Sequence, residues 1–272
     1  MKTEEITKLN TIAKKVRKEI LLMTAEARGG HYMSSLSCVD ILVALYFSAL
    51  RHNPAEPEAP DRDRMVLSKG HAAPALYAVL AECGYFSRQE LMSLRRYDSR
   101  LQGHPVYHRL PGLDASSGSL GQGISTAVGI ALAGKLDRKD YRVFVLLGDG
   151  ECQEGQVWEA AMSAAHYHLD NLIVLIDKND LQISGATDVV MSLGELSAKW
   201  RSFGWEVFEA DGHDISDLIE TLERTRATLH RPKVIIASTV KGSGVPFIEN
   251  NLNYHTAPLT DDELKRALEY FG

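Results

Sequence analysis

The chain of 272 residues has little cysteine, and its three cysteines are widely spaced, with no CxxC pair. An odd number of scattered cysteines argues against a disulfide framework, so we expect reduced thiols in a cytoplasmic protein. No run of 18 apolar residues is present, so the sequence contains no candidate membrane span. The N-terminus has a charged, amphipathic helix pattern and lacks the apolar segment of a signal peptide.

A surplus of basic charge is also missing, because 30 basic residues stand against 36 acidic ones and the net charge is −6. A general nucleic-acid binder normally shows a basic face, so this balance argues against that class. It leaves room for a local basic pocket that binds phosphates. No internal repeat, low-complexity tract or clear boundary interrupts the chain, and we expect a single domain over residues 1–272.

Strand patterns and helix patterns alternate along the chain. Strands are predicted at 65–67, 143–147, 172–176, 205–210 and 233–238. Helices are predicted at 4–27, 39–50, 71–82, 88–96, 121–136, 153–168, 192–203, 215–229 and 260–270, with long loops at 51–64, 98–119, 180–191 and 241–258. This alternation predicts an α/β fold with a mainly parallel sheet that is covered by helices on both faces.

The most informative stretch is VFVLLGDGECQEG, which starts at Val143. Its apolar run is typical of a strand buried on both faces, and Gly148-Asp149-Gly150 ends that strand. A helix and a second apolar strand follow, and Asn179 comes just after them. A right-handed crossover sets the two strands close in one sheet, so we expect Asp149 and Asn179 side by side at the carboxyl edge, where ligands bind in open α/β sheets.

These residue types suit a metal bound to a diphosphate. Mg²⁺ takes oxygen ligands and usually shares them with phosphates. Asp149 offers a carboxylate, Asn179 an amide oxygen, and a main-chain carbonyl just after Asn179 a third oxygen. The glycines let a diphosphate approach the backbone, and a following helix N-terminus adds N–H donors. Gly-Asp-Gly alone is also an ordinary turn at the end of a strand, so the prediction depends on the whole unit.

Four of the ten histidines lie in loops beside predicted elements, at positions 31, 71, 104 and 255. Imidazoles donate to phosphate oxygens and sugar hydroxyls, so a cluster of them suits a phosphosugar better than an apolar ligand. For any single histidine, a surface or capping role is the simpler alternative. Five others have no motif around them and receive no role: His52, His108, His166, His168 and His230.

Six motifs occur in order over nearly the whole chain: LSKGHAAPALYAVL (67–80), QGHP (102–105), LGQGIS (120–125), GDGECQEG (148–155), ISGAT (183–187) and HTAP (255–258). The Gly-Asp-Gly unit, followed by 28 residues and then Asn179, resembles the thiamine diphosphate signature. Together the motifs resemble the transketolase family, over its N-terminal, diphosphate-binding section only.

The resemblance implies a thiamine-diphosphate-binding fold with defined ligands. Asp149, Asn179 and the carbonyl of Leu181 would bind the metal, which would be Mg²⁺ or another divalent cation such as Ca²⁺ or Mn²⁺. Gly148 and Gly150 would lie against the diphosphate. Gly118, Leu120 and Gly121 would line the thiazolium side of the cofactor.

The same resemblance assigns roles to polar side chains. His71 and His255 would contact the diphosphate, with His255 also near the sugar, and His31 and His104 would hold substrate hydroxyls. Glu154 would belong to an acidic network that joins paired active sites. Lys241, in a mobile loop with two glycines (Gly242 and Gly244), would bind phosphate; a solvated loop charge is the alternative.

One departure concerns the string Gly29-Gly30-His31-Tyr32-Met33, where the family commonly has Ser-Gly-His-Pro-Gly. Tyr32 and Met33 add bulk near the first histidine. They would signal an acceptor sugar other than the pentose phosphates, or they simply pack against the following helix.

The pyrimidine-binding domain, with its glutamate, and the arginines that hold the sugar phosphate have no counterpart here. The resemblance therefore implies one half of a split transketolase, with sugar phosphate substrates and a partner subunit that carries the pyrimidine-binding and C-terminal domains in an α₂β₂ assembly. Three alternatives stay open: the α subunit of a 2-oxoacid dehydrogenase, a truncated relative of deoxyxylulose phosphate synthase, and a non-catalytic cofactor-binding module. The intact Asp149, Asn179 and Glu154 argue against the last.

Overall fold

The fold is built on one parallel sheet, seen in a computed structural model that describes residues 3–255 and 257–272. Thr256, within the HTAP motif, and residues 1–2 lie outside the described residues. The strands, in spatial order, are β1 (Arg64–Leu67), β2 (Val143–Gly148), β3 (Leu172–Lys178), β7 (Lys233–Ser238) and β6 (Glu206–Asp211). All four strand pairs are parallel. The predicted sheet is confirmed, and β2 and β3 are neighbours, as the crossover argument requires.

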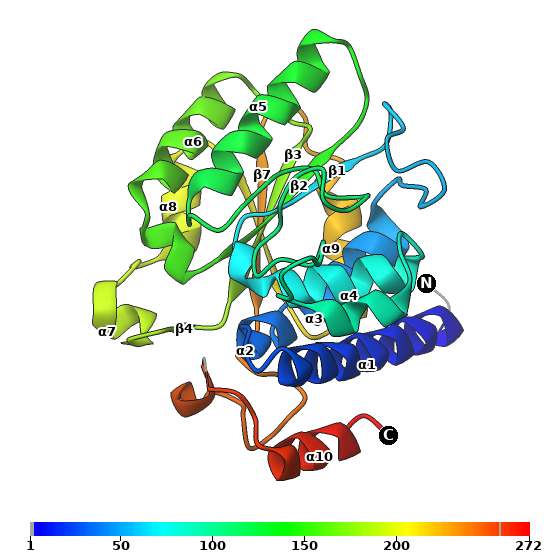
Figure 1. Cartoon of the computed structure of the whole chain (residues 1–272). Helices are drawn as coiled ribbons and strands as arrows, with labels where there is room; N and C mark the ends of the chain where they lie inside the picture. The colour runs from blue at the N-terminus through cyan, green and yellow to red at the C-terminus, as the bar shows by residue number, and fades with distance from the viewer. Residues whose placement is uncertain (1–2, 256) are drawn as a thin grey trace.

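Helices cover both faces of the sheet (Figure 1). One face carries α1 (Thr3–Glu26), α3 (Val39–Ala44), α4 (Ala73–Cys83) and α9 (Ile215–Thr225), and the other carries α5 (Gln122–Leu136), α6 (Gly155–His166) and α8 (Leu196–Ser202). The short α2 (Tyr32–Leu36) follows α1, and α10 (Asp261–Glu269) packs beside α1. None of the described helices is long and apolar enough to cross a membrane.

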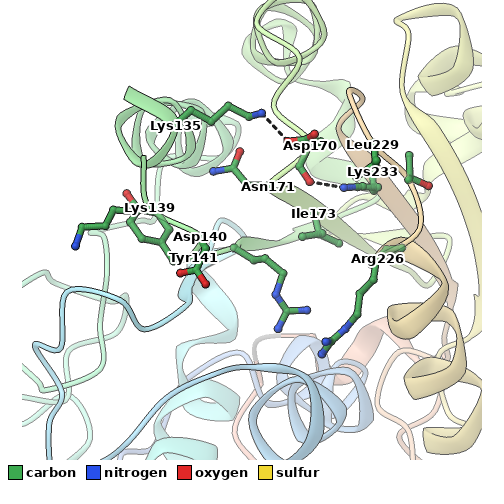
Figure 2. A pocket seen from close by; sticks show the side chains of 13 residues that line it. Lys135, Lys139, Asp140, Tyr141, Asp170, Asn171, Ile173, Arg226, Leu229 and Lys233 are labelled. Carbon is green, nitrogen blue, oxygen red and sulfur yellow. Dashed lines mark hydrogen bonds and ion pairs between the residues drawn. The ribbon is translucent and has the colours of Figure 1, made fainter. Parts of the chain in front are cut away.

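The amino-terminal edge of the sheet has its own cleft, of about 330 Å³. Figure 2 shows Lys135 and Lys233 both directed at Asp170 in this cleft. Lys135 pairs with the Asp170 carboxylate at 2.6 Å, and Lys233 donates to the Asp170 carbonyl. These cations are engaged within the protein and lie near the C-terminal end of α9, where positive charge is favourable. Both lysines therefore already have partners within the protein.

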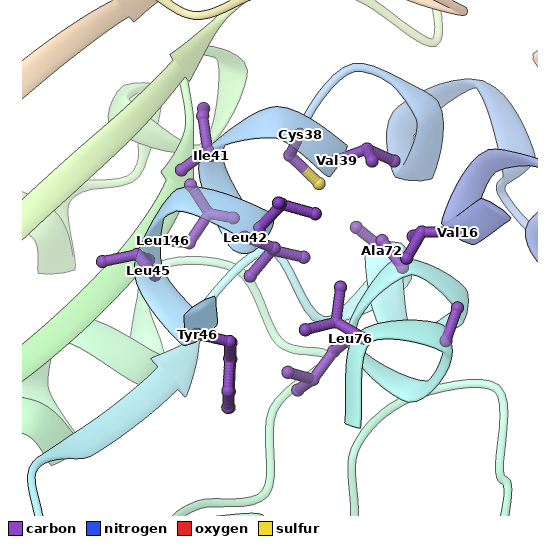
Figure 3. Close-up of a cluster of buried hydrophobic side chains, with 14 of the residues drawn as sticks. Val16, Cys38, Val39, Ile41, Leu42, Leu45, Tyr46, Ala72, Leu76 and Leu146 are labelled. Carbon is purple, nitrogen blue, oxygen red and sulfur yellow. The ribbon is translucent and has the colours of Figure 1, made fainter. Parts of the chain in front are cut away.

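Side chains alternate along each central strand, which is why both faces are buried. Phe144 and Leu146 face the layer of α1, α3 and α4, whereas Val145 and Leu147 face α5 and α6. Figure 3 shows Leu146 beside Leu42 and other apolar residues of that first layer. The continuous apolar pattern of these strands follows directly from burial on two sides.

Helix ends follow local capping chemistry. α4 has a proline in its first turn and ends at Gly84, whose φ of 91° gives the left-handed conformation of a helix C-terminus. The side chain of Asp214 accepts the first free N–H groups of α9. Thr260 and Glu263 form a capping box at the start of α10.

Several predicted boundaries were wrong. The helix predicted at 39–50 turns into a π-helix at Leu45–Ala49, and that at 88–96 is a 3-10 helix at Arg88–Ser93, because these turns share the apolar spacing of an α-helix. The helix predicted at 192–203 begins only at Leu196, since Gly194 has a φ of 58° that no right-handed helix includes. Similarly, α9 stops at Thr225 rather than at 229.

The predicted loop at 180–191 contains regular structure. It forms the short hairpin β4 (Leu181–Gln182) and β5 (Gly185–Ala186), followed by α7 (Thr187–Met191). Two-residue strands are too short to give an alternating pattern, so the sequence does not predict them. The three cysteines are free thiols, as predicted, and burial raises the pKa of Cys152 well above its ordinary value, which suits a buried filler and not a nucleophile.

Close packing of α5 against the end of β1 gives a matched pair of substitutions. A Cβ on Gly123 would lie 2.5 Å from Ser68 Oγ and 2.7 Å from Ser68 Cα, whereas one on Gly129 meets nothing within 4 Å. We expect Gly123→Ala to lower the free energy of unfolding by about 1–3 kcal/mol through overpacking. Gly129→Ala should leave it unchanged or raise it by up to about 1 kcal/mol, through helix propensity. Urea unfolding of the isolated chain measures both, and equal effects would contradict the packing argument.

Candidate active site

The candidate site is a cavity of about 350 Å³ at the carboxyl edge of the sheet. Its lining comes from segments far apart in sequence: His31, Ser34, Lys69, His71, His104, Gly118, Leu120, Gly148, Asp149, Gly150, Glu151, Gln153, Glu154, Asn179, Leu181, Gln182, Ile183, Ser184, Lys241 and His255. Every residue predicted for the site lines this cavity except Gly121. The N–H of Gly121 instead donates at 2.9 Å to the carboxylate of Glu151, which does line the cavity, so Gly121 supports the lining without being part of it.

Asp149 and Asn179 lie at the tips of the adjacent strands β2 and β3, where Gly148 pairs with Asp177. The carboxylate of Asp149 accepts the N–H of Gly150 at 2.8 Å and that of Asp180 at 2.6 Å. Burial, and then the nearby charge of Asp177, raises the pKa of Asp149 to about 6. A buried carboxylate with a raised pKa lacks a full counter-charge, which a bound cation would supply.

The oxygens at this point suit a hard cation. Asn179 Oδ1 accepts the N–H of Leu181 at 3.2 Å, and the carbonyl of Leu181 accepts the ammonium of Lys241 at 3.0 Å. A positively charged group thus already lies on one of the three predicted metal ligands. Among the described residues no three His, Cys, Asp or Glu side chains gather as a metal cluster, so the protein offers a partial shell only. Such a set fits Mg²⁺ when phosphate or water oxygens complete the octahedron.

Lys241 is buried, with only 3% of its surface exposed. Burial, and then the charge of Lys69, lowers the pKa of Lys241 to about 8. The alternative of a solvated loop charge is therefore wrong. The ammonium donates to the main-chain carbonyl of Leu181, and its remaining N–H groups can donate to an anion in the cavity.

Three of the four predicted histidines lie against one another. The ring centroids of His31 and His71 are 5.3 Å apart, and those of His31 and His255 are 5.9 Å apart. His104 lies beside Gly118, where a Cβ would come within 3.1 Å of its ring. Burial lowers the pKa of all four, that of His255 to about 4. Near neutral pH each ring is uncharged and offers one donor and one acceptor.

A buried ion pair beneath the cavity was not predicted. Lys69, 1% exposed, pairs with Asp177 and donates to the carbonyl of Ser34 at 3.0 Å. Burial alone would raise the pKa of Asp177, but the ammonium of Lys69 and hydrogen bonds from Ser37 and Thr239 keep it below its ordinary value. The SKGHA motif contains Lys69, yet nothing local indicates a partner 108 positions away.

Glu151 and Ser34 were also missed. The buried carboxylate of Glu151 accepts from Ser68 Oγ at 2.5 Å and from the N–H groups of Gly121 and Gly148, so it joins two glycine turns. Ser34 lines the cavity, and within the described part of the chain its buried hydroxyl has no hydrogen-bond partner. The available signals were a glutamate directly after the Gly-Asp-Gly turn and a serine one helical turn after His31.

Tyr32 and Met33 turn away from the cavity. Both are buried, and the Tyr32 hydroxyl donates to the carbonyl of Ala257 at 3.0 Å. Their burial agrees with packing rather than with sugar recognition, although the Tyr32 hydroxyl contacts the segment after His255 and not the following helix, and these residues give no information on the acceptor sugar. Instead, Tyr32 ties α2 to the segment that carries His255.

The β4–β5 hairpin and α7 leave apolar side chains in solvent beside the cavity. Ile183, which lines the cavity, is 69% exposed, and Val189 is 84% exposed. Val190 and Met191 are exposed as well. An apolar patch next to a binding cavity is typical of a surface that another protein covers.

A parallel sheet whose edge presents a carboxylate, an amide and a carbonyl to a polar cavity is the arrangement that the predicted thiamine-diphosphate-binding domain requires. The family model described as "Transketolase, thiamine diphosphate binding domain" matches residues 9–272. The chain belongs to the transketolase family.

Some relatives match this chain from end to end. It is 40% identical to a protein of Phocaeicola vulgatus named as one of the subunits of apulose-4-phosphate transketolase, over 97% of this chain and 94% of that protein. It is 41% identical to 6-deoxy-6-sulfo-D-fructose transketolase subunit SqwG of a Clostridium species, over 98% and 97%. The predicted transketolase activity of a chain that works with a partner subunit is confirmed at the level of this class.

The solved transketolases are longer. The crystal structure from Campylobacter jejuni superposes with a TM-score of 0.92 at 32% identity, over all of this chain but 43% of that one. Human transketolase is 38% identical over 98% of this chain and 42% of its own length. The chain thus spans about two-fifths of these proteins, and the predicted fold is confirmed.

The raised pKa of Asp149 predicts a pH-dependent stability. Between about pH 4 and pH 6 the folded chain holds a proton that the unfolded chain has released, so this group lowers the free energy of unfolding as pH rises through that window. The full effect is about 2–3 kcal/mol. The cofactor-free Asp149→Ala variant should therefore gain about that much stability relative to wild type between pH 4 and pH 7 in urea unfolding. An exposed carboxylate variant, Glu58→Ala, should show no such gain, and a flat difference for Asp149→Ala would contradict the buried charge.

Proposed function

We propose that this chain is the N-terminal, diphosphate-binding half of a split transketolase, folded as a single domain over residues 1–272. One observation carries the proposal: a metal-type oxygen set and four imidazoles share a single cavity, in a chain that aligns along nearly its whole length with separate transketolase subunits. The partner would be another polypeptide with the pyrimidine-binding and C-terminal domains.

The cofactor would bind by its diphosphate. Asp149, Asn179 and the Leu181 carbonyl would hold Mg²⁺, or Ca²⁺ or Mn²⁺ in its place, and the metal would share its remaining positions with phosphate oxygens. His71, His255 and Lys241 would donate to the same phosphates. When bound, thiamine diphosphate supplies the nucleophilic carbon that accepts a two-carbon ketol unit from a ketose.

The diphosphate would also need the close approach that glycine allows. Gly148 and Gly150 sit at the tip of β2, where the main chain faces the cavity. The hydroxyl of Ser34, which has no hydrogen-bond partner among the described residues, adds a further donor to the cavity lining. Gly118 and Leu120 would lie against the thiazolium ring, with Gly121 supporting them from behind.

The sugar would meet the imidazoles at the outer part of the cavity. His31, His104 and His255 would bind its hydroxyls, and neutral rings suit this task because each both donates and accepts. The relatives carry names for apulose-4-phosphate and for 6-deoxy-6-sulfo-D-fructose. We therefore propose an anionic ketose, phosphorylated or sulfonated, as donor and an aldose as acceptor.

The partner would complete the site from outside. Glu154 lines the cavity and is exposed, so it is free to join an acidic network that reaches across an interface. The exposed apolar residues of the β4–β5 hairpin and α7 would be covered by the same contact. An α₂β₂ assembly in the cytoplasm is the arrangement that we propose.

The 2-oxoacid dehydrogenase alternative shares the metal set but passes an acyl group to a lipoyl domain. The four-histidine cavity, suited to hydroxyl groups, favours ketol transfer. Lipoyl-dependent turnover by the reconstituted complex would decide for the alternative. A non-catalytic module would retain the cofactor without turnover.

Reconstitution tests the proposal. The chain alone should show no ketol transfer, and adding the C-terminal subunit should restore it from a ketose phosphate donor. In that complex Asp149→Ala should lower both cofactor retention and turnover by at least about 100-fold, since it removes the only charged metal ligand. Glu58→Ala should match wild type. Full activity of the chain alone would refute the split enzyme, and undiminished retention in Asp149→Ala would refute the metal site.

A further inference from the structure

A chain of polar groups runs under the cavity from α1 to the loop that carries Lys241. Arg17 of α1 makes a two-point contact with Asp40 of α3, and both side chains are buried. Asp40 Oδ2 lies 2.8 Å from Nδ1 of His213, which stands in the turn between β6 and α9. The N–H of Val240 then donates to Nε2 of His213 at 2.8 Å.

These contacts select one form of His213. A main-chain N–H only donates, so Nε2 must be unprotonated and Nδ1 must carry the proton that faces Asp40. Burial alone would raise the pKa of Asp40, but the His213 hydrogen bond and the charge of Arg17 keep it below its ordinary value. The carboxylate thus fixes both the tautomer and the orientation of the ring, as carboxylates do for functional histidines.

Val240 directly precedes Lys241, so the His213 ring fixes the backbone next to this lysine. The next residues are held as well: Gly242 N–H donates to the Met33 carbonyl at 3.1 Å, and Asn250 N–H donates to the Lys241 carbonyl at 2.9 Å. Gly242 has a φ of 84°, a conformation that glycine adopts at little cost. The sequence predicted a mobile loop here, whereas the structure ties its first residues to two other segments and to Asn250 of the loop itself.

We propose that His213, oriented by Asp40 and Arg17, is a positioning residue that places Lys241 at the diphosphate end of the cavity. It contacts neither the cavity nor any residue proposed to hold the metal. His213 acts through its hydrogen bond from the Val240 N–H. That bond fixes the backbone next to Lys241, so that the Lys241 ammonium reaches the Leu181 carbonyl. The importance of this placement for the diphosphate rests on the proposed function; the anchoring itself does not.

Hydrogen exchange of the isolated chain tests the anchoring. In His213→Ala the Val240 N–H loses its acceptor, so a peptide covering residues 239–245 should exchange at least about tenfold faster than in wild type. His213→Gln places a carbonyl oxygen near the position of Nε2 and should exchange nearly as slowly as wild type. His166→Ala, a change at a histidine outside the network, should leave this peptide unaffected. Unchanged exchange in His213→Ala would overturn the proposal, and so would equally fast exchange in the Gln and Ala variants.

A double-mutant cycle tests the placement of Lys241. With Mg²⁺ and inorganic pyrophosphate as the probe, calorimetry on the chain should show about tenfold weaker binding for His213→Ala and for Lys241→Met. If His213 acts through Lys241, adding His213→Ala to Lys241→Met should cause no further loss. Additive losses would overturn the proposal.

Failure of this inference and failure of the proposed function are distinguishable. Undiminished pyrophosphate binding in Lys241→Met would overturn the placement, while loss of binding in Asp149→Ala would still support the metal site. Undiminished binding in both variants would reject the proposed diphosphate site as a whole.

Discussion

The site depends on the buried pairing of Lys69 with Asp177. Asp177 is the penultimate residue of β3, and it accepts hydrogen bonds from Lys69 in the segment after β1, Ser37 in the segment after α2 and Thr239 in the segment after β7. His71 and Lys241 lie two residues after Lys69 and Thr239, and His31 directly precedes α2, so one carboxylate connects segments that line the cavity. Leaving such a buried charge unpaired costs about 3–5 kcal/mol, so these contacts favour the arrangement in which the segments meet at Asp177.

The electrostatic design follows from that pairing. Because Asp177 uses the charge of Lys69, neither Asp149 nor Lys241 has a full counter-ion of its own. The pKa of Asp149, raised to about 6, and that of Lys241, lowered to about 8, are consistent with buried charges that lack a full counter-ion. A metal diphosphate would supply a positive charge to the first and negative charge to the second. The histidines, kept neutral by burial, would leave hydroxyl recognition independent of this charge balance.

Much of this architecture could be predicted from the sequence, because its signals are local. Unbroken apolar runs predict strands buried on two faces, and Asp149 and Asn179 follow such runs directly. What the sequence missed depends on distant contacts or on very short elements. Lys69 meets Asp177 across 108 positions and His213 meets Asp40 across 173, so no motif contains both partners. The role of Tyr32 was ambiguous because the sequence shows a bulky residue beside the site but not whether its ring points into the cavity or away from it.

The exposed apolar residues of the β4–β5 hairpin and α7 have a consequence for the synthesis of the protein. Ile183 of the hairpin, with Val189 and Met191 of α7, would give an isolated copy an exposed apolar surface, and such surfaces promote aggregation of newly synthesised chains. A cell that produced the two halves in unequal amounts would leave the surplus half exposed to chaperones and proteases. Under the proposed two-chain arrangement, matched amounts of the two polypeptides would keep this surface covered.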